Sequence, residues 1–127
     1  MPRRRISSGS PYEAMVGCSR AVAVGDRIVT SGTAPIWPDG RCDPDVTVQA
    51  RRCLEIILAA LAEGGATAGD VIRTRIYLTD AADVDAIARV HGEVFGSIRP
   101  ANTMVVVKLV DPRWRLEIEA EAIVGSA

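Results

Sequence analysis

The stretch Arg99-Pro-Ala-Asn-Thr-Met-Val-Val-Val-Lys-Leu-Val-Asp-Pro-Arg-Trp-Arg-Leu-Glu-Ile-Glu-Ala-Glu-Ala-Ile-Val124 decides the fold of this chain. It predicts two β-strands joined by a turn at residues 110–114. From Leu116 onward, apolar residues alternate with Glu117, Glu119 and Glu121, so one face of the last strand is apolar and the other carries three carboxylates. Carboxylates are poor strand formers, and a row of three therefore indicates that this face has a specific role.

The length and composition predict an ordinary globular protein with one domain spanning residues 1–127. Of its 127 residues, 48% are hydrophobic, and the formal net charge is −1. Because there is no basic excess, no nucleic-acid partner is expected, and residues 3–5, three arginines, are interpreted as part of a terminal tail. No apolar run is long enough to cross a membrane and no signal-peptide pattern is found. The prediction is a cytoplasmic protein with no membrane partner.

The cysteines and the single histidine give no sign of a metal site or a nucleophilic triad. Cys18, Cys42 and Cys53 are odd in number and irregularly spaced, which predicts free thiols and neither a disulfide framework nor a zinc site. His91 has no accompanying nucleophile motif, and it is interpreted as a histidine on a helix surface. No metal and no cofactor are therefore predicted.

Hydrophobic periodicity and turn residues divide the chain into seven regular elements after a polar N-terminal arm, residues 1–15. A β-hairpin is predicted at 18–24 and 27–32, around a turn at Gly25-Asp26. After a loop at 34–44, a helix should begin near Asp45 and end at Gly64-Gly65. A strand at 70–78, a helix at 82–95 and the two closing strands complete the order.

The resulting order, β-β-α-β-α-β-β, predicts an α+β fold. We expect one mixed sheet with two helices packed on one face, against the even-numbered residues of the strand at 70–78. The other face is predicted to carry a mixture of charged, apolar and aromatic side chains: Arg73, Arg75, Tyr77, Asn102, Met104, Val106, Lys108, Glu117, Glu119 and Glu121. Such a face is too apolar for water and too charged for a monomer's core, which favours a subunit interface.

With these elements in place, the chain resembles the reactive-intermediate deaminase family, also called Rid or YjgF and, in older names, the L-PSP endoribonucleases. Short motifs recur in the family's order along nearly the whole chain: Ser10-Pro11-Tyr12, Thr30-Ser31-Gly32, Gln49-Ala50-Arg51, Asp70-Val71-Ile72-Arg73, Arg99-Pro100-Ala101 and Leu116-Glu117-Ile118-Glu119. The resemblance implies a chorismate-mutase-like fold and a homotrimer with a central barrel and three clefts between subunits. It also implies cofactor-free hydrolysis of enamines and imines, such as 2-aminoacrylate and 2-iminobutyrate, to a 2-keto acid and ammonia.

The resemblance also implies roles for individual residues. The catalytic residue that positions the attacking water is Glu117, and the substrate-binding residues are Tyr12, Ser31, Gly32 and Asn102. Asn102 stands where the family has an Arg that holds the substrate carboxylate, so a neutral amide replaces a charged bidentate fork. Loss of such a charge-assisted pair costs about 1.5–3 kcal/mol, which predicts a specificity different from standard 2-imino-acid deamination.

Two classes of function remain open on the sequence. The first is a cofactor-free hydrolase of an imine, enamine or related small molecule; the second is a non-catalytic small-ligand-binding or regulatory trimer. RNA cleavage is disfavoured, since the chain lacks a histidine pair and a basic groove.

Some residues also have alternative roles. Glu117 could instead form an ion pair with Arg73 or Arg75, and either of these or Arg99 could replace the missing cation. Tyr12 could simply be an arm aromatic buried against a neighbour.

Overall fold

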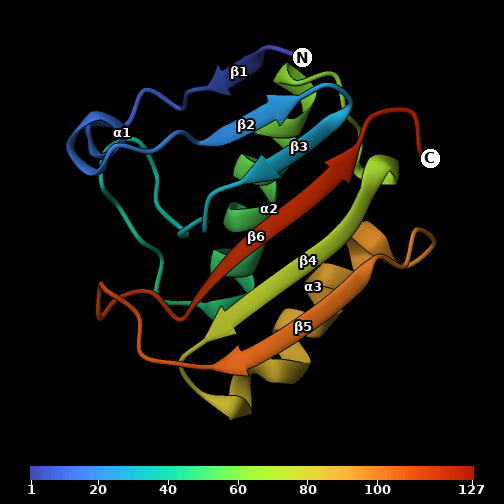
Figure 1. Cartoon of the computed structure of the whole chain (residues 1–127). Helices are drawn as coiled ribbons and strands as arrows, with labels where there is room; N and C mark the ends of the chain where they lie inside the picture. The colour runs from blue at the N-terminus through green and yellow to red at the C-terminus, as the bar shows by residue number, and fades with distance from the viewer.

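One mixed six-stranded sheet forms the centre of the molecule, in the strand order β1-β2-β3-β6-β4-β5. A computed structural model describes all 127 residues (Figure 1). The strands are β1 (Arg3–Ile6), β2 (Ala21–Val24), β3 (Arg27–Thr30), β4 (Val71–Leu78), β5 (Ala101–Val106) and β6 (Leu116–Ile123). The helices are α1 (Pro11–Val16), α2 (Val46–Glu63) and α3 (Val84–Phe95), with short 3-10 turns at Ala68–Asp70 and Ala81–Asp83.

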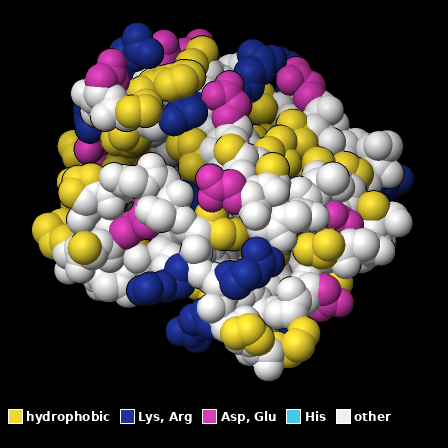
Figure 2. All heavy atoms as spheres, turned by 90° about the horizontal axis from the view of Figure 1, so that it is seen from above, with side chains coloured by type: hydrophobic (Ala, Val, Ile, Leu, Met, Phe, Trp, Pro, Cys, Tyr) yellow, Lys and Arg dark blue, Asp and Glu magenta, His cyan; other side chains and the backbone are white.

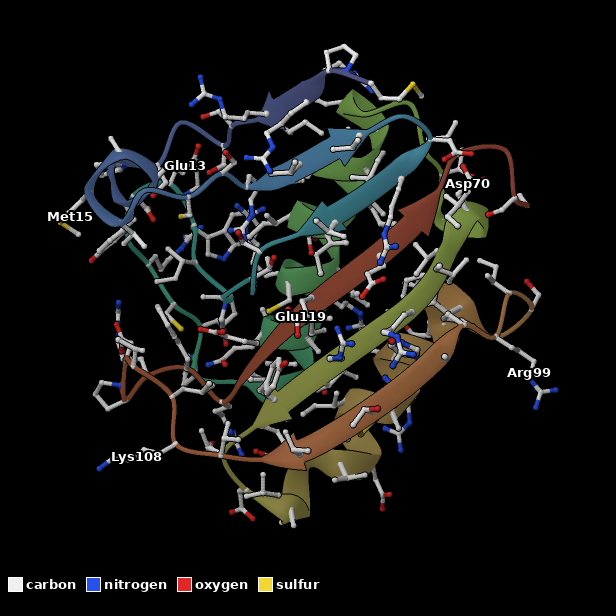
Figure 3. All side chains as sticks on the ribbon, in the orientation of Figure 1. Glu13, Met15, Asp70, Arg99, Lys108 and Glu119 are labelled. Carbon is white, nitrogen blue, oxygen red and sulfur yellow. The ribbon has the colours of Figure 1, made fainter.

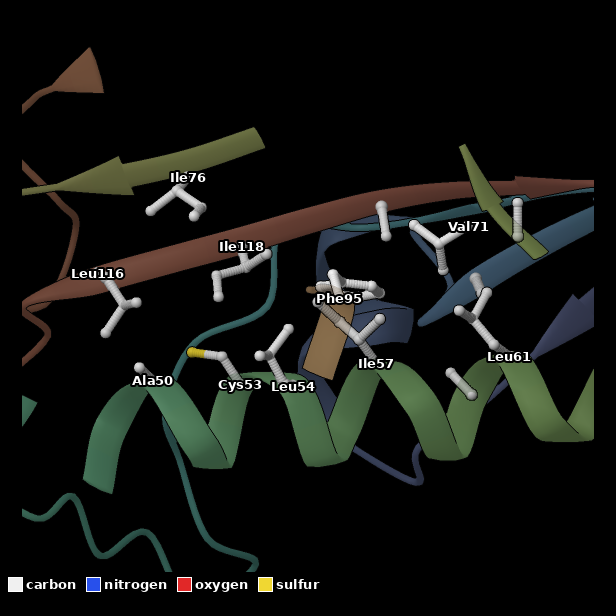
Figure 4. Close-up of a cluster of buried hydrophobic side chains, with 14 of the residues drawn as sticks. Ala50, Cys53, Leu54, Ile57, Leu61, Val71, Ile76, Phe95, Leu116 and Ile118 are labelled. Carbon is white, nitrogen blue, oxygen red and sulfur yellow. The ribbon is translucent and has the colours of Figure 1, made fainter. Parts of the chain in front are cut away.

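The two long helices lie on one face of the sheet, as the sequence predicts (Figure 1). Helix α2 begins where expected because the Asp45 side chain accepts hydrogen bonds from the N–H groups of Thr47 and Val48. Its apolar stripe packs against the sheet in a core whose members include Leu54, Ile57 and Phe95 (Figure 4). The predicted α+β fold with two helices on one face is confirmed.

Strand β6 is the central element of the sheet and has the alternation that its sequence predicts. It pairs antiparallel with both β3 and β4. Its apolar residues Leu116, Ile118, Ala120 and Ala122 are buried toward the helices, and its three glutamates lie on the opposite, open face. Strands β5 and β6 are adjacent in sequence but not in the sheet, because β4 lies between them.

The face predicted from the sequence for the side chains of β5 is wrong. Strand β5 runs parallel to β4, with Asn102 paired to Thr74, Met104 to Ile76 and Val106 to Leu78. The β4 partners are all buried under the helices, so Asn102, Met104 and Val106 belong to the helix side and not to the open face. The error has a physical cause: a shift of one residue in the assumed phase moves every side chain to the other face.

The N-terminal segment is more ordered than the predicted polar arm. Residues 3–6 form strand β1, which pairs antiparallel with β2 and extends the sheet by one edge strand. Ser10 caps the short helix α1 through a hydrogen bond from the N–H of Tyr12. Three consecutive arginines show no period-two alternation, which is why no strand could be predicted here.

The face of the molecule seen from above carries no large field of one charge (Figure 2). In Figure 2, basic and acidic side chains are interspersed among apolar ones over the face seen from above. No helix of the chain combines the length and apolar character needed to span a bilayer.

The C-terminus is attached to the fold through Asp70. This carboxylate is 4% exposed, and its Oδ1 accepts hydrogen bonds from the backbone N–H groups of Gly125, Ser126 and Ala127. Its Oδ2 accepts from the N–H and hydroxyl of Thr67. These hydrogen bonds favour the charged form and hold the pKa of Asp70 below its usual value.

We predict that Asp70→Asn lowers the melting temperature by several degrees at pH 7, because an amide offers one acceptor oxygen where the carboxylate offers two. A depressed pKa stabilises the fold above the unfolded pKa of about 4, and this contribution is lost as the pH falls through the folded value. The difference between wild type and variant should therefore shrink in acid. Thermal unfolding between pH 3 and 7 tests this, with the exposed Asp26→Asn as control; equal melting temperatures at pH 7 would contradict it.

Candidate functional site

Two of the three glutamates on β6 are neutralised by neighbours on the open face. Arg75 on β4 lies 3.3 Å from Glu121 and 3.8 Å from Glu119, and Arg27 on β3 lies 2.9 Å from Glu121. The hydroxyl of Tyr77 donates to Glu119. Glu119 lies on the front of β6, facing away from the helices (Figure 3). These two carboxylates are therefore parts of a cross-strand network.

Glu117 differs from them because its carboxylate has neither a hydrogen-bond nor an ion-pair partner. The expected alternative, an ion pair with Arg73 or Arg75, is not formed. Burial raises the pKa of Glu117, opposed by the charge of Arg20. A half-buried carboxylate of raised pKa with free lone pairs is better suited to accept a proton than an ordinary exposed glutamate.

The segment Ser31-Gly32 lies directly against this carboxylate. Pairing between β3 and β6 stops at Val29 and Glu121 and resumes only at an isolated bridge between Thr33 and Ile118. A Cβ atom at position 32 would lie 2.8 Å from Oε2 of Glu117, so a larger residue there would require the Glu117 side chain to move.

Ser31 has a structural part in the same bend. Its N–H donates to the carbonyl of Arg20 and its hydroxyl donates to the carbonyl of Ser19. The Ser31 hydroxyl therefore stabilises the bend of the backbone, and Gly32 is the residue of this segment that contacts Glu117.

Arg20 is a member of this site that the sequence analysis missed. Its Nη2 donates to the carbonyl of Gly32 at 2.8 Å, whereas its buried Nε has no partner. Burial lowers the pKa of Arg20, and the negative charges of Glu13 and Glu117 oppose this effect. The two-residue turn at Gly25-Asp26 sets the hairpin register. When this register is extended by one pair, Arg20 lies opposite Ser31. The turn was therefore the sequence signal that could have placed Arg20 beside this site.

The start of β6 is fixed by the buried amide of Gln49 on α2. Its Oε1 accepts from the N–H of Arg115, and its Nε2 donates to the carbonyls of Asp43 and Arg113. The Arg115 guanidinium in turn forms a two-pronged ion pair with Asp83. These contacts hold the chain two residues before Glu117 and so position its side chain.

Neither Tyr12 nor Asn102 forms a hydrogen bond with Glu117 within one chain. Tyr12 is on α1 with 65% of its surface exposed. Asn102 pairs with Thr74, and Thr74 pairs with Ala120, which is three residues beyond Glu117 on β6. Paired residues point to the same face, so Asn102 lies on the helix side of the sheet, opposite to Glu117. One chain therefore brings Glu117 together with Gly32 and the adjoining Ser31, and it places Asn102 on the other face of the sheet.

The arginines considered as replacements for the missing cation have different surroundings. Arg75 is engaged by the glutamate network, and Arg73 lies on the same open face without an ion pair. Arg99 points away from the sheet into solvent (Figure 3).

Asn102 and the single histidine form a small polar cluster under the edge strand. Asn102 Nδ2 lies 2.9 Å from Thr74 Oγ1, which lies 2.8 Å from Nε2 of His91 on α3. His91 also packs against Phe95, with ring centroids 4.7 Å apart. The predicted surface histidine is thus partly buried, and burial lowers its pKa. Nowhere in the chain do three or more histidine, cysteine or acidic side chains gather in a way that could hold a metal ion.

Comparison with known proteins agrees with the fold and the motifs. The family model described as Endoribonuclease L-PSP matches residues 9–124. The crystal structure of Rv2704 from Mycobacterium tuberculosis, a member of the YjgF/YER057c/UK114 family, is 43% identical and has a TM-score of 0.90, with 97% of this chain and 100% of that chain covered.

A relative from Escherichia coli strain K12 carries the provisional name reactive intermediate deaminase TdcF. It is 32% identical over 108 residues, which cover 82% of this chain and 84% of the relative. The crystal structure of E. coli TdcF with bound serine has a TM-score of 0.79 at 31% identity, covering 94% of this chain and 93% of that one. This chain belongs to the reactive-intermediate deaminase family, the Rid or YjgF proteins that the L-PSP model describes.

Proposed function

We propose that this protein is a cofactor-free hydrolase of the deaminase type, acting on an imine, enamine or related small molecule. The observation that supports it best is Glu117, an unpaired, half-buried carboxylate against Gly32 in a row whose other members are paired. The provisional name of TdcF and the serine bound to it support a small-molecule substrate.

Glu117 would act as the general base for water. Its carboxylate takes a proton from a water molecule as the water oxygen bonds to the carbon of the protonated imine, which gives a neutral tetrahedral carbinolamine. Glu117 then returns this proton to the nitrogen. As the carbon–nitrogen bond breaks, the carboxylate takes the hydroxyl proton, the carbonyl forms and ammonia leaves; the proton on Glu117 is then released to solvent. The raised pKa of Glu117 suits both steps, since the group must accept and then release a proton.

The complete site would lie between subunits of a homotrimer. Glu117 and Asn102 are on opposite faces of one sheet, so they can contact the same small ligand only if they come from different subunits. The open face of the sheet also carries Val29 and Val105, exposed by 38% and 40%, among its paired charges. This mixture suits burial against a second copy of the chain.

A non-catalytic ligand-binding trimer is the second candidate function. The observation in its favour is Asn102, which lacks the charge of the Arg that the family resemblance implies at this position. Substitution of Glu117 distinguishes the two candidate functions, because ligand binding can persist without its carboxylate whereas hydrolysis cannot.

We predict a trimer in solution. Light scattering at micromolar concentration should give about three times the monomer mass of 13.5 kDa. An Arg75→Glu variant, which places like charges beside Glu119 and Glu121, should weaken assembly because the open face would carry uncompensated charge. A monomeric wild type would remove the basis for a shared cleft.

We also predict that Glu117→Gln lowers kcat for imine hydrolysis by about 10²–10⁴-fold, because the amide cannot take the proton of water. Ammonia release can be followed with imines generated in the assay by an amino acid oxidase. In the wild type, kcat should fall in acid with an apparent pKa above the ordinary glutamate value of about 4.3. The exposed Glu63→Gln should keep wild-type turnover.

The same Glu117 variant tests the environment of this residue independently of turnover. A carboxyl whose folded pKa is raised destabilises the fold above that pKa, so Glu117→Gln should raise the melting temperature at pH 7 and lose this gain toward pH 4. Ligand binding with no ammonia release from any imine would favour the non-catalytic trimer.

A further inference from the structure

The amide of Asn102 is oriented by Thr74, which offers two oxygen acceptors to its NH2 group. Nδ2 lies 2.9 Å from the hydroxyl Oγ1 of Thr74 and 3.5 Å from its backbone carbonyl oxygen. A carbonyl oxygen can only accept a hydrogen bond, so the amide atom facing it must be the NH2 group. The carbonyl oxygen Oδ1 of Asn102 is consequently left facing outward.

A hydrogen-bond chain beneath the strand reinforces this orientation. Thr74 is fully buried, and its Oγ1 also lies 2.8 Å from Nε2 of His91. Because Oγ1 accepts from Asn102, its own hydrogen is free to be donated to Nε2 of His91. His91 is then neutral with its proton on Nδ1, in agreement with the lowering of its pKa by burial.

We propose that Asn102 presents a hydrogen-bond acceptor to the ligand and therefore recognises a donor group, such as an amide or amine, in place of a carboxylate. This inference rests on the proposed function, in which Asn102 lines the ligand cleft, and it names the substrate class of that site. Asn102 is exposed on the edge strand β5, and no group of the chain donates to its Oδ1. A carboxylate placed there would bring two acceptors together with no hydrogen between them, whereas an N–H group would complete the chain.

The inference specifies the ligand chemistry of the site. An arginine at position 102 would offer only donors and a positive charge, whereas the anchored asparagine offers one neutral acceptor. The preferred substrate would be an imine or enamine whose adjoining group is a carboxamide or amine.

A pair of probes that differ only in this group tests the inference. We would titrate wild-type protein with 2-oxobutanamide and with 2-oxobutanoate by calorimetry, since neither ketone needs turnover to bind. The wild type should bind the amide at least tenfold more tightly. Thr74→Val should bring the two affinities within about threefold, because the 2.9 Å hydrogen bond to Oγ1 is lost and only the longer 3.5 Å contact with the backbone carbonyl remains, so the NH2 group can turn outward. The exposed Thr79→Val is the matched control and should keep the wild-type preference.

Two further measurements make the result decisive. Asn102→Arg should reverse the preference in favour of 2-oxobutanoate. The ring-nitrogen shifts of His91 in the free protein should show the proton on Nδ1; a proton on Nε2 would make Thr74 Oγ1 the acceptor from His91, free the Thr74 hydrogen for Oδ1 of Asn102 and contradict the proposed hydrogen-bond chain.

Equal or tighter binding of the carboxylate by wild type would overturn it as well, as would the failure of both probes to bind. Ammonia release from imines by the same preparation is measured separately. Hydrolysis that depends on Glu117 would leave the proposed function standing even where the preference at Asn102 fails.

Discussion

The strict alternation of β6 is the constraint on which both the fold and the candidate site depend. Its apolar residues face α2 and its glutamates face the open side, and the strand pairs with β3 and β4 at the same time. A slip of one residue would bury three carboxylates under α2 and expose Leu116 and Ile118. The hydrophobic core therefore fixes the register, and the register places Glu117 against Gly32.

The parts of the structure that could be predicted from the sequence are those with a strong local signal. Helix α2 shows both an apolar period and an aspartate cap, and the hairpin of β2 and β3 shows a Gly-Asp turn. The row of glutamates indicated an unusual face before any neighbour was known. Each of these features is determined within a few residues, so no long-range contact had to be inferred.

The parts that could not be predicted depend on contacts between distant segments. The face of β5 is one example, because Val105, Val106 and Val107 give no alternation from which to read its phase. Pairing with β4 sets that phase, and it turns Asn102 toward Thr74 and His91. Strand β1 is another example, since it depends on pairing with β2 and on the burial of Ile6 in the core.

The isolation of Glu117 follows from how the neighbouring polar groups are used. Tyr77 is its cross-strand partner in the register, yet the Tyr77 hydroxyl donates to Glu119. Arg20 influences the pKa of Glu117, yet its guanidinium donates to the carbonyl of Gly32.

Each neighbouring group thus satisfies another acceptor, and Glu117 bears the desolvation cost without a compensating hydrogen bond. Replacement by glutamine would remove that cost, so a fold selected for stability alone has no reason to keep a carboxylate here. In the proposed function, a water molecule bound at Glu117 would supply the missing hydrogen bond, and Glu117 would be the carboxylate of β6 whose charge serves the reaction.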